Sequence, residues 1–273
     1  MSVSRSISKC VILARGLGTR MKSGEAGTSL NTEQSSMASS GLKAMIPVGR
    51  PFLDYVLSAL ANAGFRQACL VIGPEHNLVR EYYTSARTNR IEVTFAVQAH
   101  ALGTANAVLA AEEFAGADEF LTINGDNYYP VEVLEALREL GQPGTVLFEA
   151  EALVRESNVP PERVREYAYA VIDAEGFLAD LVEKPEAETA ATIAGPKLVS
   201  MNCWRFSPGI FPVCREVPQS PRGEYELPLA VKLAIQRGLK FKSATCRVGV
   251  LDLSRRSDIA AIADHLREVQ AEL

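Results

Sequence analysis

The chain has 273 residues, a formal net charge of −5 and 47% hydrophobic residues, a composition typical of a globular protein with a sizeable core. Lysine and arginine are scattered along it, which argues against nucleic acid as the main partner, and no apolar run is long enough to cross a membrane. The five cysteines lie far apart, without metal-ligand or redox spacing. We therefore expect free, mostly buried thiols and a cytoplasmic protein.

The first half of the chain alternates short apolar runs with amphipathic segments. The expected strands are Cys10–Ala14, Ala68–Ile72, Ile91–Val97 and Phe120–Ile123. The expected helices are Phe52–Ala63, Leu78–Ser85, Thr104–Phe114 and Val131–Leu140. Strands that alternate with helices are typical of an α/β fold, so we expect a mostly parallel sheet with helices on both faces.

The pattern changes in the second half. The expected strands are Thr145–Ala150, Ala168–Ile172, Phe177–Glu183, Lys197–Phe206, Phe241–Val248 and Gly249–Leu253. A helix is expected to start near Pro228, and a closing helix carries an apolar stripe made of Ile259, Ile262, Leu266, Val269 and Leu273. An Asp-Ala-Glu-Gly turn joins the second and third of these strands, which predicts an antiparallel addition to the sheet.

One low-complexity stretch, Lys22–Gly41, interrupts the first strand–helix unit. Its serine, threonine, glycine and glutamate content predicts a mobile loop. It separates no domains, because apolar segments on either side continue the same alternating pattern. We therefore expect a single domain.

Gly16 and Gly18 directly follow the first expected strand, a placement that suits a turn whose backbone N–H groups face an anion. An ordinary tight turn is the alternative. A dinucleotide-binding fingerprint would need a third glycine where Met21 stands, and the spacing of a P-loop is absent. Arg20 stands at the turn and Lys43 just before a Pro-Val-Gly segment beyond the low-complexity stretch; both could donate to phosphate oxygens, although either alone would suit a solvated surface.

Asp126 follows the expected strand Phe120–Ile123 in an Asn-Gly-Asp-Asn sequence. Ligands of open α/β sheets bind at this end of the strands, and one or two carboxylates beside phosphates suit Mg²⁺. The alternative is a plain reverse turn. Asp252 ends the last apolar strand and is a second candidate, with the N-cap of the final helix as its alternative role.

Seven motifs occur in the order typical of the sugar-1-phosphate nucleotidyltransferases: "LARGLGTRM", "LKAMIPVGRPFLDYVL", "ALGTANAVLAA", "LTINGDNYYP", "VEKP", "MNCWRFSP" and "GEYELPLAV". The chain resembles this family over nearly its whole length. The resemblance implies one Rossmann-like three-layer α/β/α domain over residues 1–273, with a mixed, mostly parallel central sheet. It also implies a sugar-binding part over about residues 145–206, followed by C-terminal strands and helices over residues 207–273.

The resemblance also implies roles for individual residues. Nucleotide binding is implied for Leu13, Ala14, Gly16, Gly18, Thr19, Gln98, Gly103 and Thr104. Sugar-phosphate binding is implied for Asn124, Tyr169, Glu183, Lys184 and Asn202. Catalytic roles are implied for Arg20, Lys43 and Asp126, and binding of Mg²⁺, the expected cofactor, for Asp126 and Asp252. The ordinary alternatives are a strand-end charge pair for Glu183 and Lys184, and a surface polar group for Gln98.

The implied reaction joins an NTP, with dTTP or UTP favoured, to a sugar 1-phosphate and releases pyrophosphate. The nucleophile is already anionic, so three histidines in the whole chain are no obstacle. The sequence departs from the family at Arg15, where a small residue is usual, at Ala170, where glycine is usual, and in the residues after Asp252. An inactive regulator that binds nucleotide sugars therefore stays an alternative, and a nicotinamide oxidoreductase is disfavoured. Homo-oligomerisation is left open.

Overall fold

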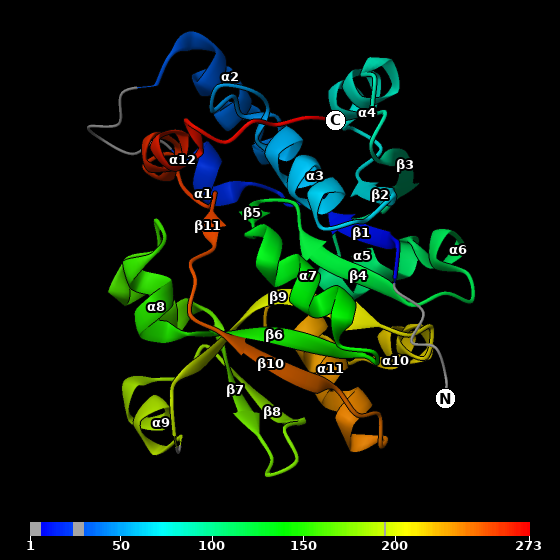
Figure 1. The fold of residues 1–273 in the computed structure, drawn as a ribbon, viewed down its shortest axis with the longest axis vertical. Helices are drawn as coiled ribbons and strands as arrows, with labels where there is room; N and C mark the ends of the chain where they lie inside the picture. The colour runs from blue at the N-terminus through cyan, green and yellow to red at the C-terminus, as the bar shows by residue number, and fades with distance from the viewer. Residues whose placement is uncertain (1–6, 24–29, 194) are drawn as a thin grey trace.

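A nine-stranded sheet forms the centre of the computed structural model, which describes residues 7–23, 30–193 and 195–273 (Figure 1). Its main strands lie in the order β10 (Lys242–Cys246), β6 (Gly144–Glu149), β9 (Leu198–Phe206), β4 (Phe120–Asn124), β1 (Lys9–Leu13), β2 (Gln67–Ile72) and β3 (Glu92–Val97). Strand β9 is antiparallel to β4 and β6, whereas the pairs β1–β2, β1–β4, β2–β3 and β10–β6 are parallel. The expected mixed, mostly parallel sheet is confirmed.

Alternate residues of the central strands enter two different apolar cores, one on each face of the sheet. Ile12 and Leu70 belong to one core, and Val11 and Cys69 to the other. The first core includes side chains of α3 (Phe52–Asn62), α4 (Asn77–Ser85), α7 (Val131–Glu139) and α12 (Asp258–Leu266). The second includes side chains of α5 (Thr104–Ala110), α10 (Ile210–Glu216) and α11 (Leu227–Gln236). Because both faces are covered, the central strands β1, β2 and β4 are mostly apolar and buried along their length, and the three-layer α/β/α arrangement is confirmed.

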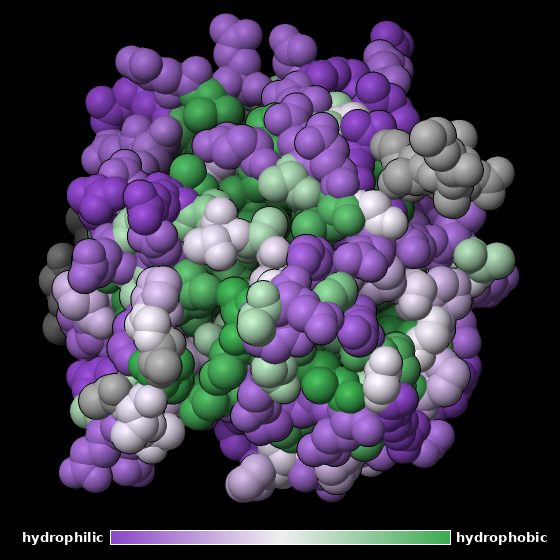
Figure 2. Space-filling view, turned by 60° about the horizontal axis from the view of Figure 1, so that its bottom comes forward, coloured by the Kyte–Doolittle hydropathy of each residue, from purple (hydrophilic) through white to green (hydrophobic). Residues whose placement is uncertain are grey.

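The outer surface is mostly polar. Figure 2 shows that on the face in view apolar side chains gather in the hollowed parts, between raised polar ones. All five cysteines are free thiols, four of them buried and Cys246 half-buried. Within the described residues no helix is long and apolar enough to span a membrane.

The expected antiparallel addition is present as the hairpin of β7 (Ala168–Ile172) and β8 (Leu178–Glu183). Its turn is held by the Asp173 carboxylate, which accepts hydrogen bonds from two backbone N–H groups of the following residues. A separate two-stranded ribbon joins β5 (Asn127–Tyr128) to β11 (Leu251–Asp252). This ribbon brings the last strand of the chain next to the residues that follow β4.

The prediction of a mobile loop over Lys22–Gly41 is wrong for its second half, which forms helix α2 (Thr32–Ser40); residues 24–29 of the stretch lie outside the described residues. A capping box starts the helix, since the Asn31 side chain accepts from the Gln34 N–H and the Gln34 side chain accepts from the Asn31 N–H. Gly41 ends it with a φ of 80°. The sequence concealed this helix because only Ala38 is buried on it, so its apolar periodicity is weak.

Other differences are local. The expected helix over Thr104–Phe114 breaks at Ala111 into α5 and α6 (Glu112–Ala115), and the closing helix ends at Leu266, short of the last two residues of the apolar stripe. Several short elements were not expected: α1 (Thr19–Lys22), η1 (Lys43–Met45), α8 (Ala150–Arg155), η2 (Pro161–Glu166), α9 (Ala187–Thr192) and α10. Each is one or two turns long, too short for apolar periodicity to reveal.

Candidate active site

A cavity of about 440 Å³ lies at the carboxyl ends of β1, β3 and β4. Twelve of the residues implied by the resemblance line it: Leu13, Ala14, Gly16, Gly18, Thr19, Arg20, Lys43, Gln98, Gly103, Thr104, Asn124 and Asp126. They come from segments far apart in sequence, which the parallel strand order brings to one edge of the sheet. The glycine turn, the lysine and the first aspartate therefore share one site.

The two glycines of the turn have different surroundings. A side chain added at Gly16 would meet nothing within 4 Å, so the space beside it is open to a ligand. Gly18 has a φ of 60°, and a Cβ there would lie 2.7 Å from both the Cα and the carbonyl oxygen of Gly41. Gly18 thus lets the end of α2 pack against the turn, while Gly16 leaves room in the cavity.

Gly103 also has a packing role. Its φ is 104°, and a Cβ there would lie 2.6 Å from the carbonyl oxygen of Tyr225. Next to it the Thr104 hydroxyl accepts a hydrogen bond from the Leu227 N–H at 2.8 Å. Gln98 is buried and donates to the Gly103 carbonyl oxygen at 3.0 Å. The alternative interpretation of Gln98 as a surface polar group is therefore wrong, because the side chain is buried in the cavity wall, and its role in nucleotide binding stays a prediction.

Lys43 and Asp126 form an ion pair in the lining of the cavity. The Lys43 Nζ lies 2.9 Å from the Asp126 Oδ2, and both side chains are partly exposed to the cavity. Burial by itself would lower the pKa of Lys43, but the charge and hydrogen bond of Asp126 raise that pKa above its ordinary value. Lys43 is therefore a firmly protonated cation beside a carboxylate, a pair able to hold phosphate and a divalent ion together.

A second cavity of about 280 Å³ adjoins the first and includes Lys184, Asn202 and Asp252 in its lining. Among the described residues, Lys184 and Asn202 are the two non-glycine residues with positive φ, at 45° and 55°. Such backbone strain in side-chain-bearing residues is concentrated at functional sites. The sequence does not reveal this backbone strain. In the structure it occurs at two residues for which the resemblance implies sugar-phosphate binding.

Two of the residues implied for sugar binding lie elsewhere. Tyr169 is buried in the apolar core between β8 and β9, and it does not line either cavity. Glu183 ends β8 and is likewise absent from both linings. Burial, with a smaller effect of Glu226, raises the pKa of Glu183 above its ordinary value. Their sugar-binding roles stay predictions.

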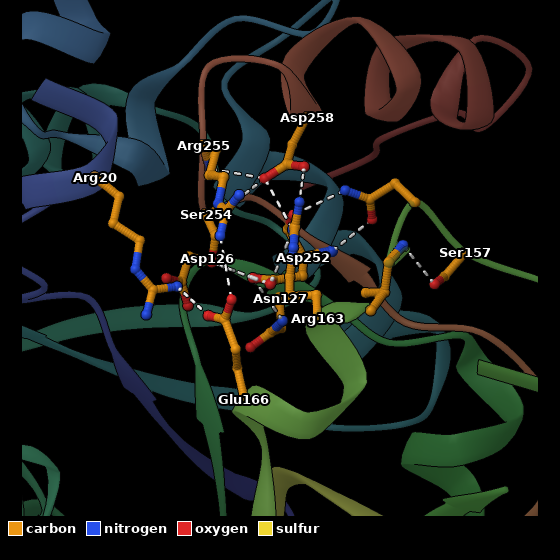
Figure 3. A network of polar contacts seen from close by, with 12 residues as sticks. Arg20, Asp126, Asn127, Ser157, Arg163, Glu166, Asp252, Ser254, Arg255 and Asp258 are labelled. Carbon is orange, nitrogen blue, oxygen red and sulfur yellow. Dashed lines mark hydrogen bonds and ion pairs between the residues drawn. The ribbon is translucent and has the colours of Figure 1, made fainter. Parts of the chain in front are cut away.

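Asp252 is buried at the centre of a polar network shown in Figure 3. Its carboxylate accepts hydrogen bonds from the Tyr167 hydroxyl at 2.6 Å and from the Ser254 hydroxyl at 2.9 and 3.0 Å. The Arg163 guanidinium lies 3.4 Å from it and pairs more closely with Asp258, at 2.7 Å. Burial first, and then the charge of Asp126, raises the pKa of Asp252. Asp252 does not cap the final helix, whose N-cap is Ser257; the Asp258 side chain instead accepts hydrogen bonds from the Ser254 and Arg255 N–H groups, which precede the helix.

Two charged residues of the site escaped the sequence analysis. Arg222 lines both cavities and forms an ion pair with Glu226 at 2.7 Å. Glu166 lies 2.9 Å from Arg20 and 3.1 Å from Arg255, and therefore occupies the guanidinium that was assigned to the triphosphate (Figure 3). Arg222 precedes the "GEYELPLAV" motif by one residue, so its charge beside a motif was a usable signal. Glu166 does not follow an apolar strand, and no signal in the sequence indicated that it belongs to the site.

A family model described as nucleotidyl transferase matches residues 32–253, a span that includes Lys43, Gln98, Asp126 and Asp252. The chain belongs to the nucleotidyl transferase family. The expected resemblance is confirmed, and nucleotidyl transfer is the reaction class of the family.

Named relatives of this nucleotidyl transferase agree with the family match. It is 26% identical over 261 residues to a UTP–glucose-1-phosphate uridylyltransferase of Haloferax volcanii, covering 95% of this chain and 97% of the relative. It is 27% identical over 238 residues to a glucose-1-phosphate thymidylyltransferase of Streptomyces griseus, covering 86% of this chain and 59% of the relative. A solved UDP-glucose pyrophosphorylase in complex with UDP-glucose superimposes with a TM-score of 0.75 at 19% identity, covering 97% of this chain and 100% of that one, and so shares its fold.

Proposed function

We propose that this nucleotidyl transferase moves a pyrimidine nucleotidyl group from dTTP or UTP to a sugar 1-phosphate, with Mg²⁺ as cofactor, in the cytoplasm. The observation that carries the proposal is the continuity of the two cavities. Both are lined by Arg20, Asn124, Asp126, Arg222 and Ser254. A nucleotide in the first cavity and a sugar phosphate in the second would meet at Asp126. The reacting groups would then lie between the basic side chains that line the two cavities.

For this reaction the protein must align the two substrates and offset their negative charge, and it needs no general base. An oxygen of the sugar phosphate attacks the α-phosphorus, the bond from that phosphorus to the bridging oxygen breaks, and pyrophosphate leaves with that electron pair. Both substrates are polyanions, so cations must offset their repulsion. Lys43 and Arg20 line the nucleotide side, and Lys184 lines the sugar side. Gly16 leaves room for backbone donors to approach phosphate oxygens.

The donor set fits a magnesium ion. Mg²⁺ is usually held by one or two carboxylates together with substrate phosphates, and Asp126 and Asp252 supply that number. Asp252 is fixed by the hydroxyls of Tyr167 and Ser254, the kind of support that orients metal-binding carboxylates. Burial first, and then the charge of Asp126, raises the pKa of Asp252, so additional positive charge beside the two carboxylates would be favourable. A bound ion would supply that charge and polarise the α-phosphate.

A pyrophosphate-release panel tests the proposal. Purified protein with Mg²⁺ would be assayed with each of dTTP, UTP, ATP, CTP and GTP against several hexose 1-phosphates, with and without a chelator. We expect release that requires both substrates, is strongest with dTTP or UTP, and stops when the metal is removed. The relatives named for UTP and thymidylyl chemistry support this preference.

A catalytically inactive regulator remains the second candidate, because Glu166 already occupies Arg20. The same panel separates the two functions. If nucleotide sugars bind, as measured by calorimetry, while no combination releases pyrophosphate, the regulatory function replaces the catalytic one.

A further inference from the structure

Arg15 is an unusually placed cation. It stands inside the glycine turn, directly before Gly16, and it lines the larger cavity. Its side chain is only 9% exposed, which is rare for arginine, a residue that is normally buried only when it is fully paired. It belongs to none of the roles described above, so its burial needs a separate explanation.

The buried guanidinium of Arg15 is mostly unpaired. Its Nη2 donates to the Glu75 carboxylate at 3.3 and 3.5 Å, which are long distances for a charged hydrogen bond, and Glu75 is half exposed. Its Nε and Nη1 are buried without any hydrogen-bond partner in the described part of the chain. Buried polar groups are otherwise paired almost everywhere in folded proteins, so an exception calls for a partner that arrives later.

The position of Glu75 shows which half of the cavity Arg15 faces. The sheet order places β1 beside β2 and β2 beside β3, with β4 on the other side of β1. Glu75 follows β2 and Gln98 follows β3, whereas Asp126 follows β4. Arg15 turns toward Glu75, hence toward the Gln98 half of the cavity and away from the Asp126 and Lys43 half, where the phosphates are assigned.

Gly73 makes this arrangement possible. A Cβ at Gly73 would lie 2.4 to 2.5 Å from the carboxylate atoms of Glu75, so only glycine lets that carboxylate fold back toward Arg15. The contact is nevertheless weak and open to water on the Glu75 side. Little therefore opposes a rotation of the guanidinium that would bring its two unpaired N–H groups into the cavity.

We propose that Arg15 is a specificity-determining residue of the nucleotide site, donating to a keto oxygen of the base. Arginine has only donors, so it favours bases whose edge presents a carbonyl oxygen, as in uracil and thymine, and disfavours the amino group that cytosine presents at the same place. The inference rests on the proposed function in one respect, namely that the larger cavity holds a nucleotide with its base on the Gln98 side.

Calorimetric titration of the full chain tests this without any need for turnover. The ligands are UTP, CTP and inorganic tripolyphosphate, and the variants are Arg15→Ala, Arg15→Lys and, as a matched control, Arg80→Ala. Arg80 packs over the Phe95 ring outside the cavity. For Arg15→Ala we expect about tenfold weaker UTP binding, the loss of one good charged hydrogen bond, with tripolyphosphate binding unchanged and the preference for UTP over CTP correspondingly reduced. Arg15→Lys should recover little, because an ammonium lacks the planar donor set.

Thermal unfolding of the same variants separates recognition from a structural role. Removing two buried unpaired donors should leave the melting temperature of Arg15→Ala unchanged or raised. A lower melting temperature with unchanged ligand selectivity would show a structural arginine and overturn the proposal. Equal losses for UTP and tripolyphosphate would place the contact on phosphate and overturn it as well. Failure of the proposed function looks different: wild-type protein would then bind UTP selectively and still release no pyrophosphate.

Discussion

Gly16 and Gly18 lie two residues apart in one turn, but only Gly18 packs closely against another part of the backbone. A methyl group at position 18 would overlap the Gly41 backbone and force alanine to a φ of 60°, whereas a methyl at position 16 would project into open space. Gly18→Ala should therefore lower the free energy of unfolding by at least about 2 kcal/mol in urea denaturation. Gly16→Ala should change it by less than about 0.5 kcal/mol but weaken NTP binding in calorimetry. Equal effects on stability would contradict this division.

Asp126 carries both the ion pair to Lys43 and half of the expected metal site. Asp126→Asn keeps the shape of the side chain but removes its charge, so Lys43 loses its counter-charge and Mg²⁺ loses a ligand. We expect the rate of pyrophosphate release to fall by at least about a hundredfold, the scale seen when one preorganised electrostatic group is removed, with an unchanged circular dichroism spectrum. Asn124→Ala, which removes a neighbouring amide without a charge, is the comparison. Near-normal turnover by Asp126→Asn would show the assignment to be wrong.

At the scale of elements, η2 reaches across the crevice to the glycine turn. Glu166, the last residue of η2, pairs with Arg20 of α1 and with Arg255, so a triphosphate must compete with a carboxylate for the Arg20 guanidinium. Glu166→Gln should raise NTP affinity several-fold, because a neutral amide competes less well than a carboxylate.

The matched control is Arg255→Gln, which removes the other partner of Glu166 and leaves the Arg20 pair in place. Both variants would be titrated with the same NTP at low and moderate salt, since contacts of exposed ions weaken with screening. Opposite changes of equal size in the two variants, both lost at moderate salt, would mean that Glu166 acts through the general charge around the site rather than through Arg20.

The elements that could be predicted are those whose pattern repeats. The strands other than the two-residue β5 and the helices α3, α4 and α7 were expected within a few residues of their observed ends, and α11 was expected near its observed start. Helix α2 was missed because its stability rests on caps at Asn31 and Gly41 rather than on an apolar face. The same holds for the site: Gly16, Lys43 and Asp126 could be predicted because they lie in recognisable sequence motifs. The placement of Glu166 and the strain at Lys184 arise from tertiary contacts, which no local pattern encodes, whereas Arg222 stands directly before a motif and could have been named.

At the scale of the whole molecule, one buried ion pair joins the start of the final helix to the body of the protein. Arg163 of η2 and Asp258 of α12 are each about 5% exposed or less and form two hydrogen bonds, at 2.7 and 3.1 Å. Although burial opposes its charge, the pKa of Arg163 is raised by Asp258, so the guanidinium is always charged. The pair also holds Arg163 beside Asp252, which links the attachment of α12 to the part of the site where we propose that Mg²⁺ binds.

Asp258→Asn should therefore be costly. It leaves the Arg163 charge buried with weakened compensation, and we expect a loss of about 3–5 kcal/mol in the free energy of unfolding. Glu216→Gln, which removes one side of the exposed pair with Arg237, should leave the unfolding midpoint unchanged. A small effect of Asp258→Asn, similar to that of the surface variant, would show that water replaces the carboxylate and that the final helix is attached mainly by its apolar side chains.

The contact between Gly18 and Gly41 has a consequence for how the protein tolerates change. After the turn that follows β1, the chain forms α1 and α2. At Gly41 it contacts Gly18 of that turn, just before η1 begins at Lys43. Because the two ends of this segment are in contact, its length can vary at little cost: the loop-closure entropy increases only slowly with the number of residues. Residues inserted at the exposed start of α2 would therefore leave the contact between Gly18 and Gly41, and with it the placement of Lys43 beside the glycine turn, as they are.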